Sequence, residues 1–221
     1  SISTIFGGRK TSADYSFKRM LNHDYISAER GFENYINNID TPPRRKLAQK
    51  MLDFTQSQIP YQQYEKGLKH QYLGSIDSAI YWLNEASITA DKDLLFEINT
   101  HRRDLAITLV DSVKIYKSEM TFDIAEKIIL KARKLVSDYY YINESLSDLY
   151  IEKGDAFNKV GNYNKAYIYY KKSEFIYPSS DTKLINKYYD LAERLIIEAD
   201  IASKSGLYPL AIESLNFVLD I

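Results

Sequence analysis

The chain has 221 residues, of which 45% are apolar and 27% charged, and its formal net charge is −1. This composition is ordinary for a folded domain, and the near-neutral charge gives no global field that would attract nucleic acid or an anionic membrane. Cysteine is absent, which excludes disulfides, thiolate metal sites and cysteine nucleophiles. No stretch approaches the roughly 18 apolar residues of a membrane-spanning helix.

Residues 1–11 are predicted to be a flexible tether. The run from Ser1 to Gly8 does not begin with methionine, so we expect that a targeting segment has been removed. The run resembles the short tether that follows the lipidated cysteine in many bacterial lipoproteins, and this resemblance implies the cell envelope. The alternative is an unstructured remnant on a cytoplasmic protein.

A first pair of antiparallel helices is predicted over about residues 12–41. Tyr25, Ala28 and Phe32 recur at the spacing of one helix face, with Tyr35 where a small residue is usual.

A separate basic helix is predicted over residues 43–58. It would end at Ile59, because a residue before proline avoids the helical region. Pro60 would then open a second pair over about residues 60–91, with its small residues at Gly67, Gly74 and Ala79.

A third pair, over about residues 106–137, is centred on Ala125 and lacks both glycines. The fourth pair, over about residues 147–180, is the clearest. In it Gly154 and Ala166 allow the helix backbones to approach closely, Gly161 suits the turn between them, and Pro178 ends the second helix.

A fifth pair is predicted over about residues 192–221, with its turn at Gly206 and its small residue at Ala211. Its second helix carries Leu215, Phe217 and Leu219. We expect the outer side of this helix to be apolar and uncovered, which would allow a homo-oligomer through the C-terminal helix.

The spacing of glycine, alanine and proline in residues 147–180 resembles the tetratricopeptide repeat (TPR), a family of stacked helix pairs. Five alanines carry the register, and they lie at 28, 79, 125, 166 and 211. The resemblance implies an all-α fold of antiparallel pairs stacked into a right-handed superhelix, or α-solenoid, in a single domain from residue 12 to residue 221.

The spacing of these alanines departs from the family, whose period is about 34 residues. Residues 92–118 and 181–205 read as unbroken amphipathic helices, so the first helix of each pair is expected to be lengthened at its N-terminal end. No segment alternates with period two, and no sheet is expected.

No constellation indicates catalysis. His-Arg-Arg-Asp-Leu at 101–105 superficially resembles a kinase catalytic loop, but it lies inside a helical pattern and has one residue too many. The three histidines are far apart, so no helical metal pair forms. We therefore predict a protein that is not an enzyme and that uses no cofactor or metal.

Two local features of the sequence could indicate binding. The cluster formed by Arg44, Arg45, Lys46 and Lys50 precedes two tyrosines that could stack on bases, but a solvated basic helix face explains it better in a neutral chain. No nucleic-acid partner is expected.

The tyrosine content is unusually high, with 20 of the 221 residues, and tyrosine is enriched at protein interfaces.

In the TPR family the first helices line a concave groove that binds a partner. Transferred by register, the groove of this chain would present aromatic residues in its N-terminal half and acidic residues in its C-terminal half. These residues are Tyr61, Tyr64, Tyr72, Asp148, Glu152, Asp155, Asn158 and Asp200. The resemblance thus implies a scaffold that binds a partner protein or peptide, and the alternative is a self-assembling or envelope-anchored spacer.

Overall fold

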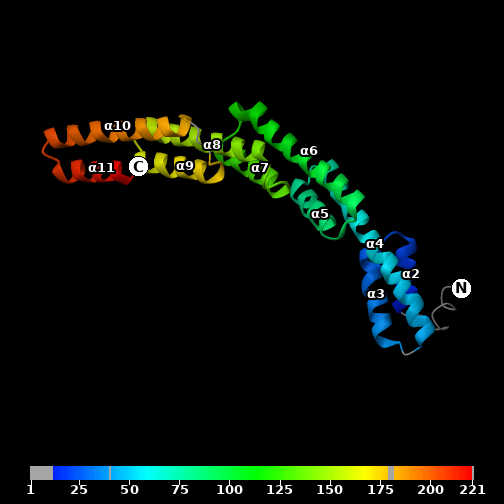
Figure 1. Ribbon diagram of the computed structural model, residues 1–221. Coiled ribbons are helices and arrows are strands. Elements are labelled where there is room, and N and C mark those ends of the chain that lie inside the picture. The colour runs from blue at the N-terminus through cyan, green and yellow to red at the C-terminus, as the bar shows by residue number, and fades with distance from the viewer. Residues whose placement is uncertain (1–11, 40, 179–181, 221) are drawn as a thin grey trace. The chain divides into compact units, whose positions relative to one another are not determined.

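The computed structural model describes residues 12–39, 41–178 and 182–220, and over these residues the chain is all-helical with no strand (Figure 1). The expected all-α fold is confirmed at this level, whereas the predicted tether lies outside the described residues. The α-helices are α2 (Ser12–Leu21), α3 (Tyr25–Asn38), α4 (Pro42–Tyr72), α5 (Ile76–Thr89), α6 (Lys92–Tyr116), α7 (Phe122–Leu135), α8 (Tyr140–Lys159), α9 (Tyr163–Ile176), α10 (Thr182–Lys204) and α11 (Tyr208–Asp220).

Adjacent helices pack in pairs, α2 with α3, α4 with α5, α8 with α9 and α10 with α11. From α4 onward a long helix alternates with a short one, whereas α2 has only 10 residues and is not lengthened, contrary to the prediction from the sequence. The second members α3, α5, α7 and α9 are each 14 residues long, and α11 has 13. The first members α4, α6, α8 and α10 have 31, 25, 20 and 23 residues. The extra length of the repeat therefore lies in the first helices, as the sequence predicts. The chain divides into two compact units, Ser1–Asp104 and Leu105–Ile221.

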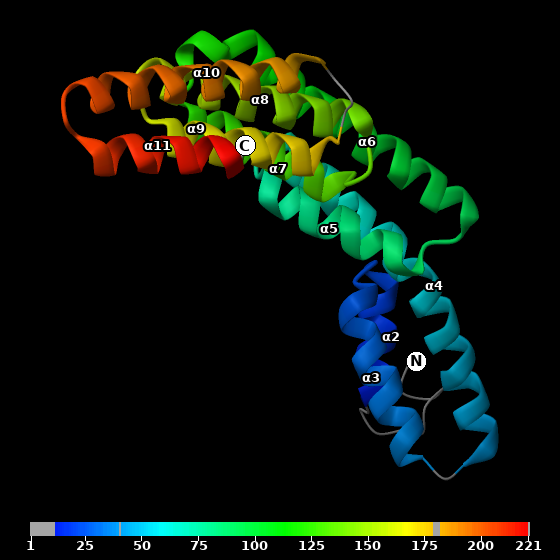
Figure 2. The same cartoon turned by 60° about the vertical axis from the view of Figure 1, so that its left-hand side comes forward.

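In the first unit, α4 packs against two different neighbours along its length (Figure 2). Ala48 and Leu52 of its N-terminal half join a buried cluster with Ala28 and Phe32 of α3. Its C-terminal half packs against α5, where Gly67 meets the side chain of Leu83. A long first helix is needed because it covers the preceding pair before it reaches its own partner.

The separation of residues 43–58 from the second pair was predicted wrongly, because α4 is continuous through Pro60. A proline inside a helix removes the hydrogen bond to the carbonyl four residues earlier and crowds that carbonyl, which here belongs to Gln56. Pro60 is nevertheless buried, so packing on both sides of it offsets the lost hydrogen bond. The local rule that ended the helix at Ile59 was overridden by tertiary contacts.

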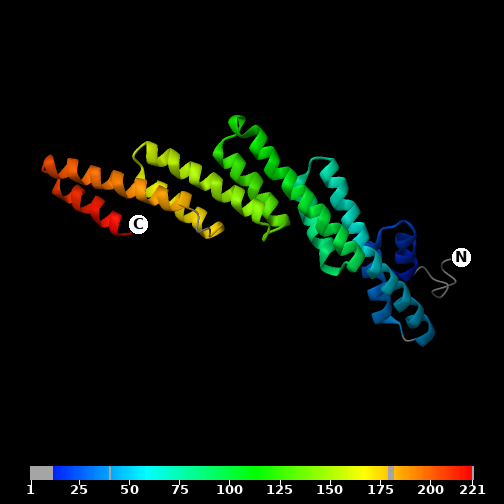
Figure 3. The same ribbon diagram turned by 45° about the horizontal axis from the view of Figure 1, so that its top comes forward.

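In the second unit, α8 pairs with α9, and α10 pairs with α11 as a helical hairpin, drawn orange and red in Figure 3. Like α4, α10 packs against the preceding helix pair as well as against its own partner. Leu184, Leu191 and Leu195 of α10 pack against Ala166 and Tyr170 of α9, and these five side chains form one buried cluster.

Four of the turns within pairs have the same backbone geometry. Gly74, Gly161 and Gly206 have φ of 73°, 75° and 74°, the left-handed region that glycine adopts without a steric penalty. The residue after each glycine donates its N–H to a carbonyl five residues earlier, the Schellman arrangement of a helix C-terminus. In the first pair His23 occupies this position, with φ of 58°. It lies five residues before Ala28, just as each of the three glycines lies five residues before the register alanine of its own pair.

Close approach between paired helices depends on glycine at two further positions. A Cβ built on Gly154 would lie 2.4 Å from Cε1 of Tyr170, and one built on Gly67 would lie 2.9 Å from Leu83. In the first pair the glycine is on the other helix, because Gly31 of α3 faces Ser16 of α2, the register equivalent of Gly154. Ala79, Ala166 and Ala211 are all buried, and Pro178 follows the end of α9.

None of the described helices has both the length and the apolar character that a membrane span requires.

Candidate partner-binding surface

Tyr61 and Tyr72 lie on one face of α4 in the first unit. They are 11 residues apart, which is close to three helical turns. Tyr72 is 90% exposed and Tyr61 is 40% exposed. The Tyr61 hydroxyl donates a 2.7 Å hydrogen bond to Oδ2 of Asp91, the residue directly before α6, and this bond holds the ring in place. Both rings therefore present aromatic surface to solvent, and the ring of Tyr61 is held in place by its hydrogen bond.

Tyr64, the third tyrosine predicted for this face, is buried instead. Its hydroxyl donates to Oε1 of Glu97 at 3.2 Å, and its ring meets His101 edge-on with the centroids 6.1 Å apart. Burial, followed by the negative charge of Glu97 and this hydrogen bond, raises the pKa of Tyr64 to about 12. Tyr64 joins α4 to α6 and offers little surface to a partner.

Three of the predicted groove residues of α8 in the second unit contact α10 or the short 3-10 turn Lys117–Glu119 that follows α6. Glu152 forms an ion pair with Lys117, and Asp155 accepts a 2.7 Å hydrogen bond from Nζ of Lys187 on α10. Asn158 is buried and donates to Oδ2 of Asp190, also on α10, at 2.8 Å. These polar contacts connect α8 to α10 and to the turn after α6.

Asp148 and Asp200 complete the predicted set. Asp148 is exposed on α8, and Asp200 on α10 pairs with Lys204 one turn later at 2.6 Å. Beside Asp200, Ile197 and Ile201 are 53% and 59% exposed. The face of α10 is thus apolar as well as acidic.

Several tyrosines bridge helices through hydrogen bonds from the hydroxyl to a carboxylate. Tyr150 donates to Glu126 at 2.7 Å, and Tyr170 donates to Asp155 at 2.8 Å. Burial is the largest cause that raises the pKa of both tyrosines well above the ordinary value, and the carboxylate partner adds to it. Part of the tyrosine excess is therefore explained by packing within the chain.

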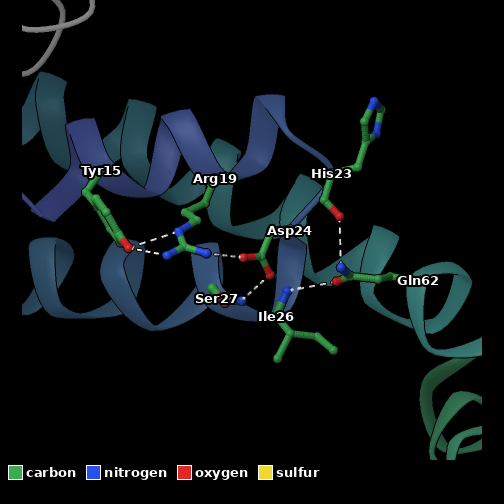
Figure 4. Close-up of polar contacts among 7 residues, drawn as sticks. All are labelled: Tyr15, Arg19, His23, Asp24, Ile26, Ser27 and Gln62. Carbon is green, nitrogen blue, oxygen red and sulfur yellow. Dashed lines mark hydrogen bonds and ion pairs between the residues drawn. The ribbon is translucent and has the colours of Figure 1, made fainter. Parts of the chain in front are cut away.

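The sequence did not indicate Gln62, which fixes the turn between α2 and α3 (Figure 4). Its side-chain nitrogen donates to the carbonyl of His23 at 2.8 Å, and its side-chain oxygen accepts from the N–H of Ile26 at 3.1 Å. Asp24 caps α3 through the N–H of Ser27 and pairs with Arg19 at 2.6 Å. A glutamine with no periodic role gives no sequence signal, whereas Asp24 stands where a helix cap is expected.

No group of three or more histidine and acidic side chains that could hold a metal ion is found in the described part of the chain. No protein-family model matches the sequence, and no curated protein matches it.

Proposed function

We propose that this chain is a non-enzymatic, tetratricopeptide-like scaffold that binds a partner protein or peptide through the face of its first helices. The proposal includes the stacking of its helix pairs into a right-handed superhelix. It is supported by the paired helices with short second members and by the recurring glycine turns at Gly74, Gly161 and Gly206.

The exposure of Tyr72, supported by Tyr61 on the same face of α4, carries the proposal. An aromatic side chain that is 90% exposed contributes nothing to the core, and tyrosine is enriched at protein interfaces. The Tyr61–Asp91 hydrogen bond lowers the entropy that this ring would lose on binding. Together the rings offer a partner apolar area with hydroxyls at its edge.

Affinity capture from the source organism tests this proposal. The double variant Tyr61→Ala/Tyr72→Ala should lose proteins that the wild-type chain retains. Tyr81→Ala is the matched control, because Tyr81 is 55% exposed but lies on α5, a second helix. Equal capture by the wild type and the double variant would contradict the role of the α4 face.

A self-assembling or envelope-anchored spacer is the second candidate, and the exposed side of α11 favours it. Ile212, Leu215 and Leu219 are 59%, 48% and 84% exposed. Static light scattering over a concentration series should then show association that Ile212→Lys/Leu219→Lys abolishes without loss of helicity. A wild-type chain that stays monomeric at high concentration would contradict this candidate.

A further inference from the structure

A hollow of about 450 Å3 lies on α8 and α9, within the size of about 300–1,000 Å3 typical of ligand pockets. It runs along α9, where Ile168, Lys172 and Phe175 follow one another at helical spacing, and Tyr150 of α8 forms its inner side. Phe175 is 83% exposed and Ile168 is 52% exposed. This elongated apolar stripe suits a segment of polypeptide better than a compact molecule.

Two lysines give the hollow its charge. Lys171 is balanced by Glu174, whose Oε2 lies 2.9 Å from Nζ of the lysine. Lys172 lies over the rings of Tyr169 and Tyr150, 4.9 Å and 5.7 Å from their centroids, and it has no carboxylate partner in the described ranges. A cation held against aromatic rings, with no ion-pair partner of its own in the described ranges, attracts an anion to the apolar stripe.

A second hollow occupies the same register in the first unit, and its chemistry is opposite. It has about 380 Å3, and Glu85 stands six residues after Ala79, as Lys172 stands six after Ala166. Ile88 likewise corresponds to Phe175. Glu29 also lines this hollow, and no lysine or arginine does. Two helix pairs thus carry a hollow at the same register, and its charge is acidic at Glu85 and Glu29 in the first unit and basic at Lys172 in the second.

We propose that the hollow on α8 and α9 binds an acidic, apolar segment of a partner protein, with Lys172 contacting a carboxylate and Phe175 and Ile168 contacting the neighbouring apolar side chain. The proposal does not rest on the α4 face, because the residues of the hollow belong to the other unit. Charge complementarity at Lys172 selects an acidic segment over a neutral one.

The test uses the whole chain and an array of short peptides that alternate Asp or Glu with Leu, Ile, Phe or Tyr. A second array replaces each acid with the corresponding amide. The best acidic peptide is then titrated by fluorescence anisotropy. Lys172→Glu and Phe175→Ser should each weaken binding by about tenfold or more, and added salt should weaken it further.

Glu85→Lys is the matched control, because it reverses the charge at the same register of the other unit and should leave the titration unchanged. Circular dichroism should show the same helicity for all three variants, since the altered side chains lie at the surface. The proposal is overturned if no acidic peptide binds, if the amide peptides bind equally well, or if Lys172→Glu binds like the wild type. None of these results depends on capture through Tyr61 and Tyr72.

Discussion

At the residue scale, His23 occupies a backbone conformation that its register equivalents assign to glycine. Its φ of 58° is in the left-handed region of backbone conformation, where a Cβ comes too close to the following carbonyl oxygen. We predict that His23→Gly stabilises the chain by up to about 1 kcal/mol. Relief of the backbone strain outweighs the loss of the exposed 3.0 Å hydrogen bond between His23 Nδ1 and the Tyr25 hydroxyl, and the Gln62 contact is retained because it uses only the backbone carbonyl of residue 23. Urea unfolding measures this change in the free energy of unfolding.

The control for this prediction is Gly161→Ala, in which the added Cβ meets no atom within 4 Å. The substitution should destabilise the chain by about 1–2 kcal/mol through backbone strain alone. If His23→Gly is neutral or destabilising while Gly161→Ala behaves as expected, the His23 side chain has a stabilising role that the strain argument omits.

Gly154→Ala should be more harmful than Gly67→Ala. The new Cβ at residue 154 would lie 2.4 Å from Cε1 of Tyr170, whereas the new Cβ at residue 67 would lie 2.9 Å from the side chain of Leu83. Tyr170 and Leu83 are both fully buried, so the closer contact with the rigid ring should cost more. We expect a loss of about 1–3 kcal/mol for Gly154→Ala and a smaller one for Gly67→Ala. Thermal melts that rank the two variants in the reverse order would contradict this description of the helix contacts.

The buried tyrosines predict a loss of stability at high pH. The folded pKa of Tyr64 is raised from the ordinary 10 to about 12, so the folded chain holds a proton that the unfolded chain releases between these values. The stabilising contribution is complete below about pH 10 and is lost as the pH rises through about 12.

Urea unfolding from neutral pH upward should therefore show a shallower alkaline decline for Tyr64→Phe than for the wild type. Tyr72→Phe serves as the control, because this side chain is 90% exposed. Parallel alkaline curves for the wild type and Tyr64→Phe would show that this hydroxyl does not contribute.

At the element scale, the proline in α4 is the most direct test of how tertiary packing overrides local preference. Pro60→Ala should restore the N–H that can donate to the Gln56 carbonyl and should relieve crowding, which together are worth up to about 3 kcal/mol. The loss of packing around the buried proline ring reduces this gain in stability, so we expect a net stabilisation of about 1–2 kcal/mol. Destabilisation in a thermal melt would show that the ring packing outweighs the missing hydrogen bond.

Helix type and spacing were predictable because they depend on local patterns. The long helices expected over residues 92–118 and 181–205 are observed as α6 and α10. The break at Pro60 was predicted wrongly, because the rule that applies before proline is local, whereas the buried contacts that hold α4 together come from α3 and α5. His23 gave no turn signal, since only its register reveals its equivalence to Gly74.

The candidate surface was less predictable than the helices. The register transferred from the TPR family gives a position on a helix but not the reach of a side chain toward a neighbour. Tyr64 and Asn158 were expected at a groove, and the structure places both in packed contacts with the next first helix. The charge reversal between Glu85 and Lys172 becomes visible only when the hollows are compared.

At the scale of the whole molecule, the central claim is that the chain is a scaffold whose first-helix face contacts another protein. A photo-crosslinking amino acid placed at Tyr72, in cells of the source organism, reports such contacts in place. The same amino acid at Tyr81 is the control on a second helix. We predict a crosslink from position 72 to a different protein and none from position 81. A crosslink from position 72 only to a second copy of this chain, or none at all, would contradict the claim.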